Sequence, residues 1–304
     1  MKNNKKLKTK LNNLTKNTIN NIEENKKKII PCDKFQITLP NEKVQVIFQK
    51  YLRKEAKKLK IDGFRQGKVP LNIAKKLINS ELILDNILKE MLPPYYEKRI
   101  KKDKLLPITY PEIKLITSDL EKDLIVEISI SQKPEIKLGD YKIFIKENRK
   151  KAEKKYKETE NQKEQSEEKK KKNDFLLTFI FNELRKKINP KVPELVLKET
   201  INDDFKNFQK QLKLAGITLE DYLEKNKITL DSISLHFESQ ALEKIQTDLI
   251  INQIIQECNI KAEKEDWEKI NKENKNLEKS QENYLYLEYF IQRRKIFDFI
   301  LNLK

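Results

Sequence analysis

The stretch from Ala56 to Pro70 reads AKKLKIDGFRQGKVP and separates two segments whose apolar residues have helical spacing. It contains two of the four glycines in the 304-residue chain. Because glycine adopts positive φ at little cost, Gly63 and Gly67 predict a turned loop rather than a continued helix. At its tip an aromatic ring, Phe64, stands beside Arg65, where it can add little to a core. The stretch therefore predicts an exposed binding loop, with one alternative left open: the ring folds back on the adjoining helices.

The segments on either side of this loop predict a mixture of helices and strands. Before it, Asn41 is expected to cap a helix whose apolar residues recur every three or four positions. After it, a second helix is expected to begin at Pro70, and a third to begin near Glu81 and bend at its Pro93–Pro94 pair. Alternation of polar and apolar residues predicts strands over five ranges: 18–24, 29–39, 112–117, 124–132 and 141–146.

The composition changes abruptly between residues 147 and 172, where lysine and glutamate dominate. Almost no apolar residue is available there to bury a face, so the tract is interpreted as a linker, either disordered or a solvated charged helix. Beyond it the spacing is helical throughout, with caps expected at Thr218 and at Thr229 or Asp231. The expected parts are a disordered basic tail (1–14), an N-terminal domain (15–117), connecting strands (118–146), the charged linker (147–172) and a helical C-terminal domain (173–304).

The chain is strongly basic, with 65 basic and 48 acidic residues and a formal net charge of +17. Such an excess favours polyanionic partners such as RNA, DNA or anionic membranes, although a genome biased toward Lys, Asn and Ile would also produce it. No apolar run reaches the ~18 residues that span a bilayer. No secretory or transit signal is visible, so we expect a cytoplasmic location and no membrane partner.

The sequence offers no catalytic or metal-binding constellation. His236 is the only histidine, and the two cysteines, Cys32 and Cys258, lie far from it and from each other. They are expected to be free thiols in a reducing compartment. Carboxylates occur in Lys/Glu patterns that are typical of solvated helix faces. We therefore predict no catalytic residue, no metal and no cofactor.

The motif Gly63-Phe64-Arg65-x-Gly67-x-x-Pro70, preceded by a basic helix and strands, resembles the ribosome-binding signature of bacterial trigger factors. The resemblance extends to residues 106–113 and 134–141 and, more weakly, into the helical half. Two departures matter. Gln66 stands where the family commonly has Lys, which removes one charge. The family also carries an FKBP-like prolyl isomerase domain between its halves, and the charged tract here is too short for one.

The resemblance implies an α+β N-terminal ribosome-binding domain, with a small antiparallel sheet and a helical hairpin, followed by an elongated all-α C-terminal chaperone domain. It implies docking at the polypeptide exit tunnel of the large ribosomal subunit, on a ribosomal protein and rRNA. The residues expected to dock are Gly63, Phe64, Arg65, Gln66, Gly67, Lys68, Pro70, Lys57, Lys58 and Lys60.

The same resemblance implies that the helical half holds unfolded nascent polypeptides on an apolar cradle, assisting folding and export. Each candidate also has the spacing of a core residue, which is the commoner role of a helical apolar stripe. The candidates are Phe175, Phe179, Phe205, Phe208, Leu212, Tyr284, Tyr286, Phe290, Phe297 and Phe299. Without the isomerase domain the chain is expected to act by binding and not as an enzyme.

Two other classes of function stay open. One is an RNA-binding or ribosome-assembly protein that uses the same basic domain without binding clients; salt-sensitive RNA affinity without suppression of aggregation would favour it. The other is a cryptic isomerase, which acceleration of proline-limited refolding would reveal. The sequence also leaves open whether the free chain forms a weak homodimer.

Overall fold

The computed structural model describes residues 28–159, 165–273 and 281–303, so the predicted tail at 1–14 and strand at 18–24 lie outside the described residues. The chain divides into two compact units. The first, called here the α+β unit, comprises residues 31–133 together with 193–195. The second, called the helical unit, comprises, among the described residues, 28–30, 134–159, 165–192, 196–273 and 281–303.

The α+β unit is built on a three-stranded antiparallel sheet, with β4 (Leu124–Ile130) between β2 (Asp33–Leu39) and β3 (Glu112–Leu115). The register sets Ile128 of β4 opposite Phe35 on one side and Ile113 on the other. Every second residue of β4, from Leu124 to Ile130, is fully buried. The alternation that predicted this strand is therefore confirmed, because one face of it packs on the core.

Three helices complete this unit: α3 (Asn41–Ala56), α4 (Leu71–Leu77) and α5 (Ser80–Asp103). Side chains four residues apart on α3, Val44, Phe48 and Leu52, are buried with the sheet and with α5 in one core. The predicted N-cap is wrong, because Pro40 precedes the first turn. Asn41 instead donates from Nδ2 to the carbonyls of Leu120 and Lys122, at 2.8 and 2.9 Å, which ties the helix to the β3–β4 connection. The third helix, α5, continues as one element through both prolines.

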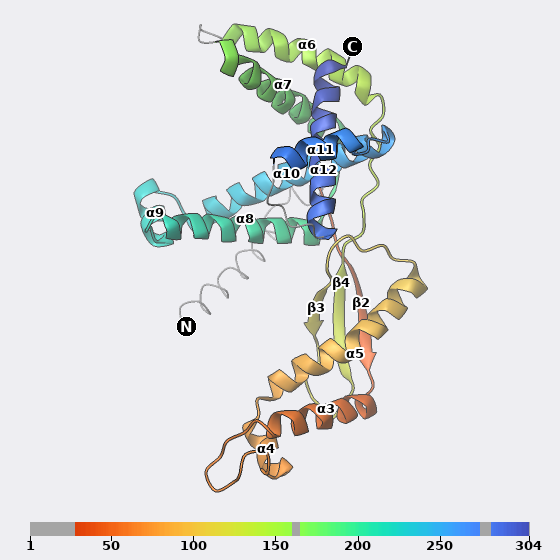
Figure 1. The fold of residues 1–304 in the computed structure, drawn as a ribbon, viewed down its shortest axis with the longest axis vertical. Helices are drawn as coiled ribbons and strands as arrows, with labels where there is room; N and C mark the ends of the chain where they lie inside the picture. The colour runs from red at the N-terminus through yellow and green to blue at the C-terminus, as the bar shows by residue number, and fades with distance from the viewer. Residues whose placement is uncertain (1–27, 160–164, 274–280, 304) are drawn as a thin grey trace. The chain divides into compact units, whose positions relative to one another are not determined.

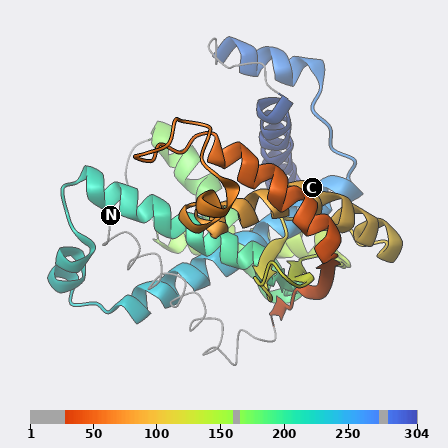
Figure 2. The same cartoon turned by 90° about the horizontal axis from the view of Figure 1, so that it is seen from below.

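The helical unit contains seven helices among its described residues. A central core joins α6, α7, α10 and α12, and a second one joins α8 to α10. Figures 1 and 2 both show α8 and α10 side by side, with α9 at their far end. Thr218 and Thr229 cap α9 and α10 as predicted, each accepting from an amide three residues on. The helix bounds are α6 (Tyr141–Thr159), α7 (Gln165–Ile188), α8 (Glu194–Leu214), α9 (Leu219–Asn226), α10 (Leu230–Glu257), α11 (Lys264–Glu273) and α12 (Gln281–Asn302).

A short strand pair lies beside these helices: β1 (Ile29–Ile30) pairs with β5 (Val192–Pro193). The carbonyl of Lys28 accepts from the amide of Val192 at 2.7 Å. Within the described ranges, every helix falls short of the length and apolar content required to cross a bilayer.

The strand predicted at residues 141–146 is wrong, since these residues form the first turns of α6. Tyr141, Ile143 and Ile145 alternate along this stretch, but Phe144 between them is also apolar, so a strand and a helix both fit the sequence. The structure buries Tyr141 and Ile145, four residues apart, and leaves Ile143 58% exposed. The helical period therefore decides which residues meet the core.

The charged tract that follows is helical wherever the structure describes it, as part of α6 and of α7. Of the two alternatives for this tract, the described residues adopt the helix. The interpretation that nothing there buries a face is wrong at two positions. Ala152 is fully buried, and the ring of Tyr156 lies 5.4 Å from that of Phe175 on α7. Small and aromatic residues at helical spacing suffice to dock α6 on α7.

Candidate functional site

The loop between α3 and α4 consists of two consecutive turns. The amide of Phe64 donates to the carbonyl of Ile61 at 3.1 Å, and that of Lys68 donates to the carbonyl of Arg65 at 2.9 Å. Gly63 and Gly67 have φ of 85° and 80°, which side-chain-bearing residues adopt only with strain. The predicted glycine turns are confirmed, and Phe64 and Arg65 lie where one turn ends and the next begins. Figure 1 shows the loop between α3 and α4.

A small core holds the base of this loop and leaves its tip outside. Ala56, Val69 and Ala74 are buried there, with Leu59 and Ile61 packed against them. All residues from Asp62 to Lys68 are exposed. Phe64 keeps 40% of its surface accessible and is not one of the side chains packed on that core. The structure therefore presents the ring at the surface rather than folding it into the helices.

Positive charge surrounds the exposed ring. Lys57, Lys58, Lys60, Arg65 and Lys68 are all exposed. Lys58 forms an ion pair with Glu55 at 2.6 Å. Among the residues that the structure describes, the other four have no ion-pair partner. Unpaired cations around an aromatic ring can contact phosphate or carboxylate groups while the ring enters an apolar recess.

The candidate client-binding side chains do not form one surface; they divide by burial. The core set is Phe205 and Leu212, which are 7% and 8% exposed. The half-buried set is Phe175, Phe179, Phe208, Phe297 and Phe299. The exposed set is Tyr284, Tyr286 and Phe290, all on the first half of α12.

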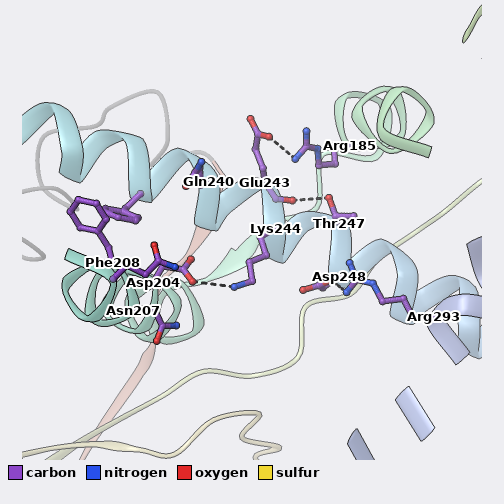
Figure 3. A pocket seen from close by; sticks show the side chains of 12 residues that line it. Arg185, Asp204, Asn207, Phe208, Gln240, Glu243, Lys244, Thr247, Asp248 and Arg293 are labelled. Atoms are coloured by element: carbon purple, nitrogen blue, oxygen red, sulfur yellow. Dashed lines mark hydrogen bonds and ion pairs between the residues drawn. The ribbon is translucent and has the colours of Figure 1, made fainter. Parts of the chain in front are cut away.

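A polar groove of about 650 Å³ lies in the helical unit, between α8 and α10 and the adjoining parts of α7 and α12. Figure 3 shows its charged side chains already paired across the helices. Arg185 pairs with Glu243 at 2.9 Å, Lys244 with Asp204 at 3.3 Å, and Arg293 with Asp248 at 2.6 Å. The remaining lining includes amides and a hydroxyl that can hydrogen-bond a peptide backbone: Asn207, Gln211, Gln240 and Thr247.

An apolar pocket of about 430 Å³ adjoins this groove near α9. Phe208, Phe237 and Gln240 line both cavities. The rings of Phe208, Tyr222 and Phe237 meet edge to face, with centroids 5.1 and 5.5 Å apart. Sequence reasoning named Phe208 and missed the rest of the pocket lining, because it comes from α9, α10 and the connection between them, whose pairing with α8 no local period reveals. The missed residues are Tyr222, Ile228, Ser232, Ile233, His236, Phe237 and Gln240.

A second apolar surface lies at the start of α12. Tyr284 stacks on Trp267 of α11 with ring centroids 4.2 Å apart and planes 9° from parallel. Leu285, Tyr286 and Phe290 are 60%, 68% and 51% exposed. A helix segment that exposes several large apolar side chains is typical of a contact surface.

The two cysteines lie apart from each other, one in each unit. In the part of the chain that the structure describes, no group of three or more His, Cys, Asp or Glu side chains is placed so that it could hold a metal ion. Cys32 and Cys258 are free thiols. Burial, with the nearby Glu194 carboxylate, raises the pKa of Cys32. Burial also raises the pKa of Tyr141, whose hydroxyl lies 3.2 Å from the sulfur of Cys258.

Comparison with known families assigns both halves of the chain. Residues 15–166 match the family described as "Bacterial trigger factor protein (TF)", and residues 145–302 match "Bacterial trigger factor protein (TF) C-terminus". The two matched ranges overlap, so no other domain separates them within this chain.

Relatives and a solved structure agree with this assignment. A trigger factor of Clostridium botulinum is 33% identical over 124 residues, or 41% of this chain and 27% of that one. One of Staphylococcus epidermidis is 33% identical over 106 residues, or 35% of this chain and 24% of that one. These alignments span about a quarter of the relatives' length. A solved structure described as "Promiscuous Substrate Recognition in Folding and Assembly Activities of the Trigger Factor Chaperone" shares the fold. It has a TM-score of 0.52 at 14% identity, covering 89% of this chain and 97% of that one.

Proposed function

Because this chain belongs to the trigger factor family, we propose that it is a ribosome-associated chaperone that docks through the loop at Gly63–Pro70. The observation that carries the proposal is the state of that loop. Its aromatic ring and its guanidinium are both exposed, and two glycines at positive φ hold the turns around them. A side chain kept at the surface with no folding role is suited to anchor a partner.

Docking has two contributions: long-range electrostatic attraction by the lysines, and direct contacts by Arg65 and Phe64. The exposed lysines around the loop attract the ribosomal RNA over a distance, and this term weakens as salt rises. Arg65 then pairs with phosphate or carboxylate, and Phe64 enters an apolar recess on a ribosomal protein at the tunnel exit. Gln66 provides no charge, so the flanking lysines supply the attraction.

The helical unit, in this proposal, holds unfolded segments of nascent chains. The polar groove offers amide and hydroxyl groups to a peptide backbone, and the adjoining apolar pocket receives a large apolar side chain of the same segment. The exposed aromatic residues of α12 offer a second apolar contact. Backbone contacts joined to one side-chain pocket give binding that tolerates many sequences.

Ribosome co-sedimentation tests the docking role. Interface anchors each carry about 2 kcal/mol or more, so Phe64→Ala with Arg65→Ala should lower ribosome affinity by more than about 100-fold. Leu82→Ala with Lys89→Ala is the matched control, since it removes an exposed apolar and an exposed basic side chain from α5 of the same unit. Both double variants should still suppress aggregation of a denatured client. Undiminished sedimentation of the loop variant would rule the docking role out.

We also propose that the chain acts without catalysis. Both matched regions are the flanking domains of the family, and no candidate acid, base or nucleophile cluster was recognised in the sequence. A refolding reaction limited by prolyl isomerisation should therefore proceed at its uncatalysed rate in the presence of the chain. Acceleration in proportion to chaperone concentration would overturn this part of the proposal.

A further inference from the structure

The outward face of α6 carries a row of lysines. Eight basic and three acidic residues occupy the 19 positions of this helix. Lys146, Lys150 and Lys154 recur every fourth residue and Lys157 follows three later, so all four lie on one face. All four are exposed. At a rise of 1.5 Å per residue the row extends roughly 16 Å along the helix axis, with about 6 Å or less of axial rise between successive positions.

The four lysines of this row are not held in ion pairs with other residues that the structure describes. Within the described residues, none of the four lysines has an ion-pair partner. Of the three acidic residues on α6, Glu153 lies 3.6 Å from Arg149, the inward-facing arginine. Glu147 and Glu158 lie on the same helix but pair with none of the four. The ammonium groups of the row are therefore free to contact an external partner, and α6 as a whole keeps five more basic than acidic residues.

The opposite face of α6 is already used. Tyr141, Ile145 and Ala152 are buried in the helical unit, and α6 lies along α7 (Figure 1). A helix that binds a membrane surface must turn an apolar face into the lipid. The apolar face of α6 is committed to its own core, and Ile143 is its one large apolar side chain that is exposed. The geometry thus favours a partner bound by charge alone.

We propose that this lysine row binds the phosphate backbone of RNA and does so independently of the Gly63–Pro70 loop. A lysine that neutralises a phosphate releases a condensed counterion, which drives binding without reading sequence. The preference for RNA over DNA rests on the proposed function, because a chain docked on a ribosome meets rRNA. The row would add a second, non-specific contact to the ribosome, on a helix that lies almost wholly within the residues matched to the family's C-terminal domain.

The test uses the full-length chain carrying Phe64→Ala and Arg65→Ala, so that the loop contributes little. Into it are introduced Lys146→Gln, Lys150→Gln, Lys154→Gln and Lys157→Gln. The control carries Lys206→Gln, Lys210→Gln, Lys213→Gln and Lys225→Gln, which remove equal charge from exposed positions on α8 and α9 of the same unit. Glutamine preserves helix propensity in both sets.

Each chain is titrated with labelled single-stranded RNA between about 50 and 200 mM salt. Each phosphate contact contributes about 0.7 to the slope of log K against log salt, so the row variant should show a slope smaller by about 2 to 3 than the control. Equal slopes and affinities for the two variants would overturn the proposal. The proposal would also be overturned if the row variant bound vesicles rich in anionic lipid more weakly than the control but bound RNA equally well.

These outcomes are separable from those that test the docking loop. If the loop variant still sediments with ribosomes and the row variant has lost RNA affinity, the docking role of the loop is refuted and RNA binding by the row is supported. If instead the loop variant no longer sediments and the row variant keeps its RNA affinity, the docking role of the loop is supported and RNA binding by the row is refuted.

Discussion

Arg149 of α6 donates from Nη1 to the backbone carbonyls of Leu301 and Leu303, at 2.7 and 3.0 Å. Leu301 lies in the last turn of α12, where carbonyls are left without a partner in the helix, and Leu303 directly follows its end. The guanidinium thus satisfies both carbonyls and opposes the negative end of the helix dipole. This contact joins α6 to the end of α12.

Removal of this cap should destabilise the helical unit. Arg149→Met keeps the aliphatic stem but leaves two carbonyls unpaired, at a cost of about 1–3 kcal/mol. Trp267 is the only tryptophan and lies in this unit, so its fluorescence during urea unfolding reports the change. Lys150→Met, at an exposed position of the same helix, is the control and should shift the midpoint little. Equal shifts for the two variants would show that the cap contributes nothing.

The positive φ of Gly63 should be required for docking. A Cβ at Gly63 would meet nothing within 4 Å, so a substitution there costs backbone strain alone. Gly63→Val should lower ribosome affinity about 5- to 30-fold, because a β-branched residue pays roughly 1–2 kcal/mol in this conformation. Gly63→Asn should bind more tightly than the valine variant, since asparagine tolerates positive φ. Equal ribosome affinities for Gly63→Val and the parent chain would show that docking does not require the positive φ of Gly63.

Exposed and buried aromatic residues of the helical unit should respond differently to truncation. Phe290→Ala should weaken the holding of denatured clients while the unfolding midpoint stays near that of the parent. Phe205→Ala should lower the free energy of unfolding by about 3–5 kcal/mol, because the ring is buried. Urea titration and an aggregation assay, run on both variants, distinguish the two roles. A Phe290→Ala chain with full client holding would remove that residue from the proposed surface.

The Cys32 thiol should resist alkylation to an unusually high pH. Burial, then the carboxylate of Glu194, raises its pKa above the ordinary value. The folded state thus favours the neutral thiol. The contribution of this thiol to the free energy of unfolding is fully present below the pKa of the unfolded state, and it is lost as pH rises through the raised pKa of the folded state. Glu194→Gln removes the negative charge and should speed reaction of Cys32 with iodoacetamide several-fold at mildly alkaline pH. Reaction of Cys258, measured in a Cys32→Ser chain, should not respond to Glu194→Gln.

The sequence predicted those features that a local period or a turn residue determines. The glycines set the loop at residues 63–67, the alternation of residues 124–130 set the central strand, and Thr218 set the start of α9. The segment at 141–146 failed because its apolar residues satisfied two periods at once. Only packing against α7 and α10 selects the helical one.

The candidate surfaces were less predictable than the elements that carry them. The stacking of Trp267 on Tyr284, and the pocket shared by Phe208, Tyr222 and Phe237, each join residues of different helices. Likewise, Phe205 is buried and Phe290 is exposed, although the sequence predicts both as apolar positions on a helix. Exposure depends on tertiary partners, which spacing along one helix does not specify.

Site-specific photocrosslinking from the loop tests the central claim most directly. A photoreactive amino acid replaces the exposed Gln66, and the chain is irradiated with ribosomes; the control places it at Val46, which is 70% exposed on α3 of the same unit. We predict that position 66 crosslinks to a protein or rRNA segment at the tunnel exit and that position 46 crosslinks to neither. Crosslinks of equal yield from both positions, or none from position 66 while the chain stays ribosome-bound, would contradict the account.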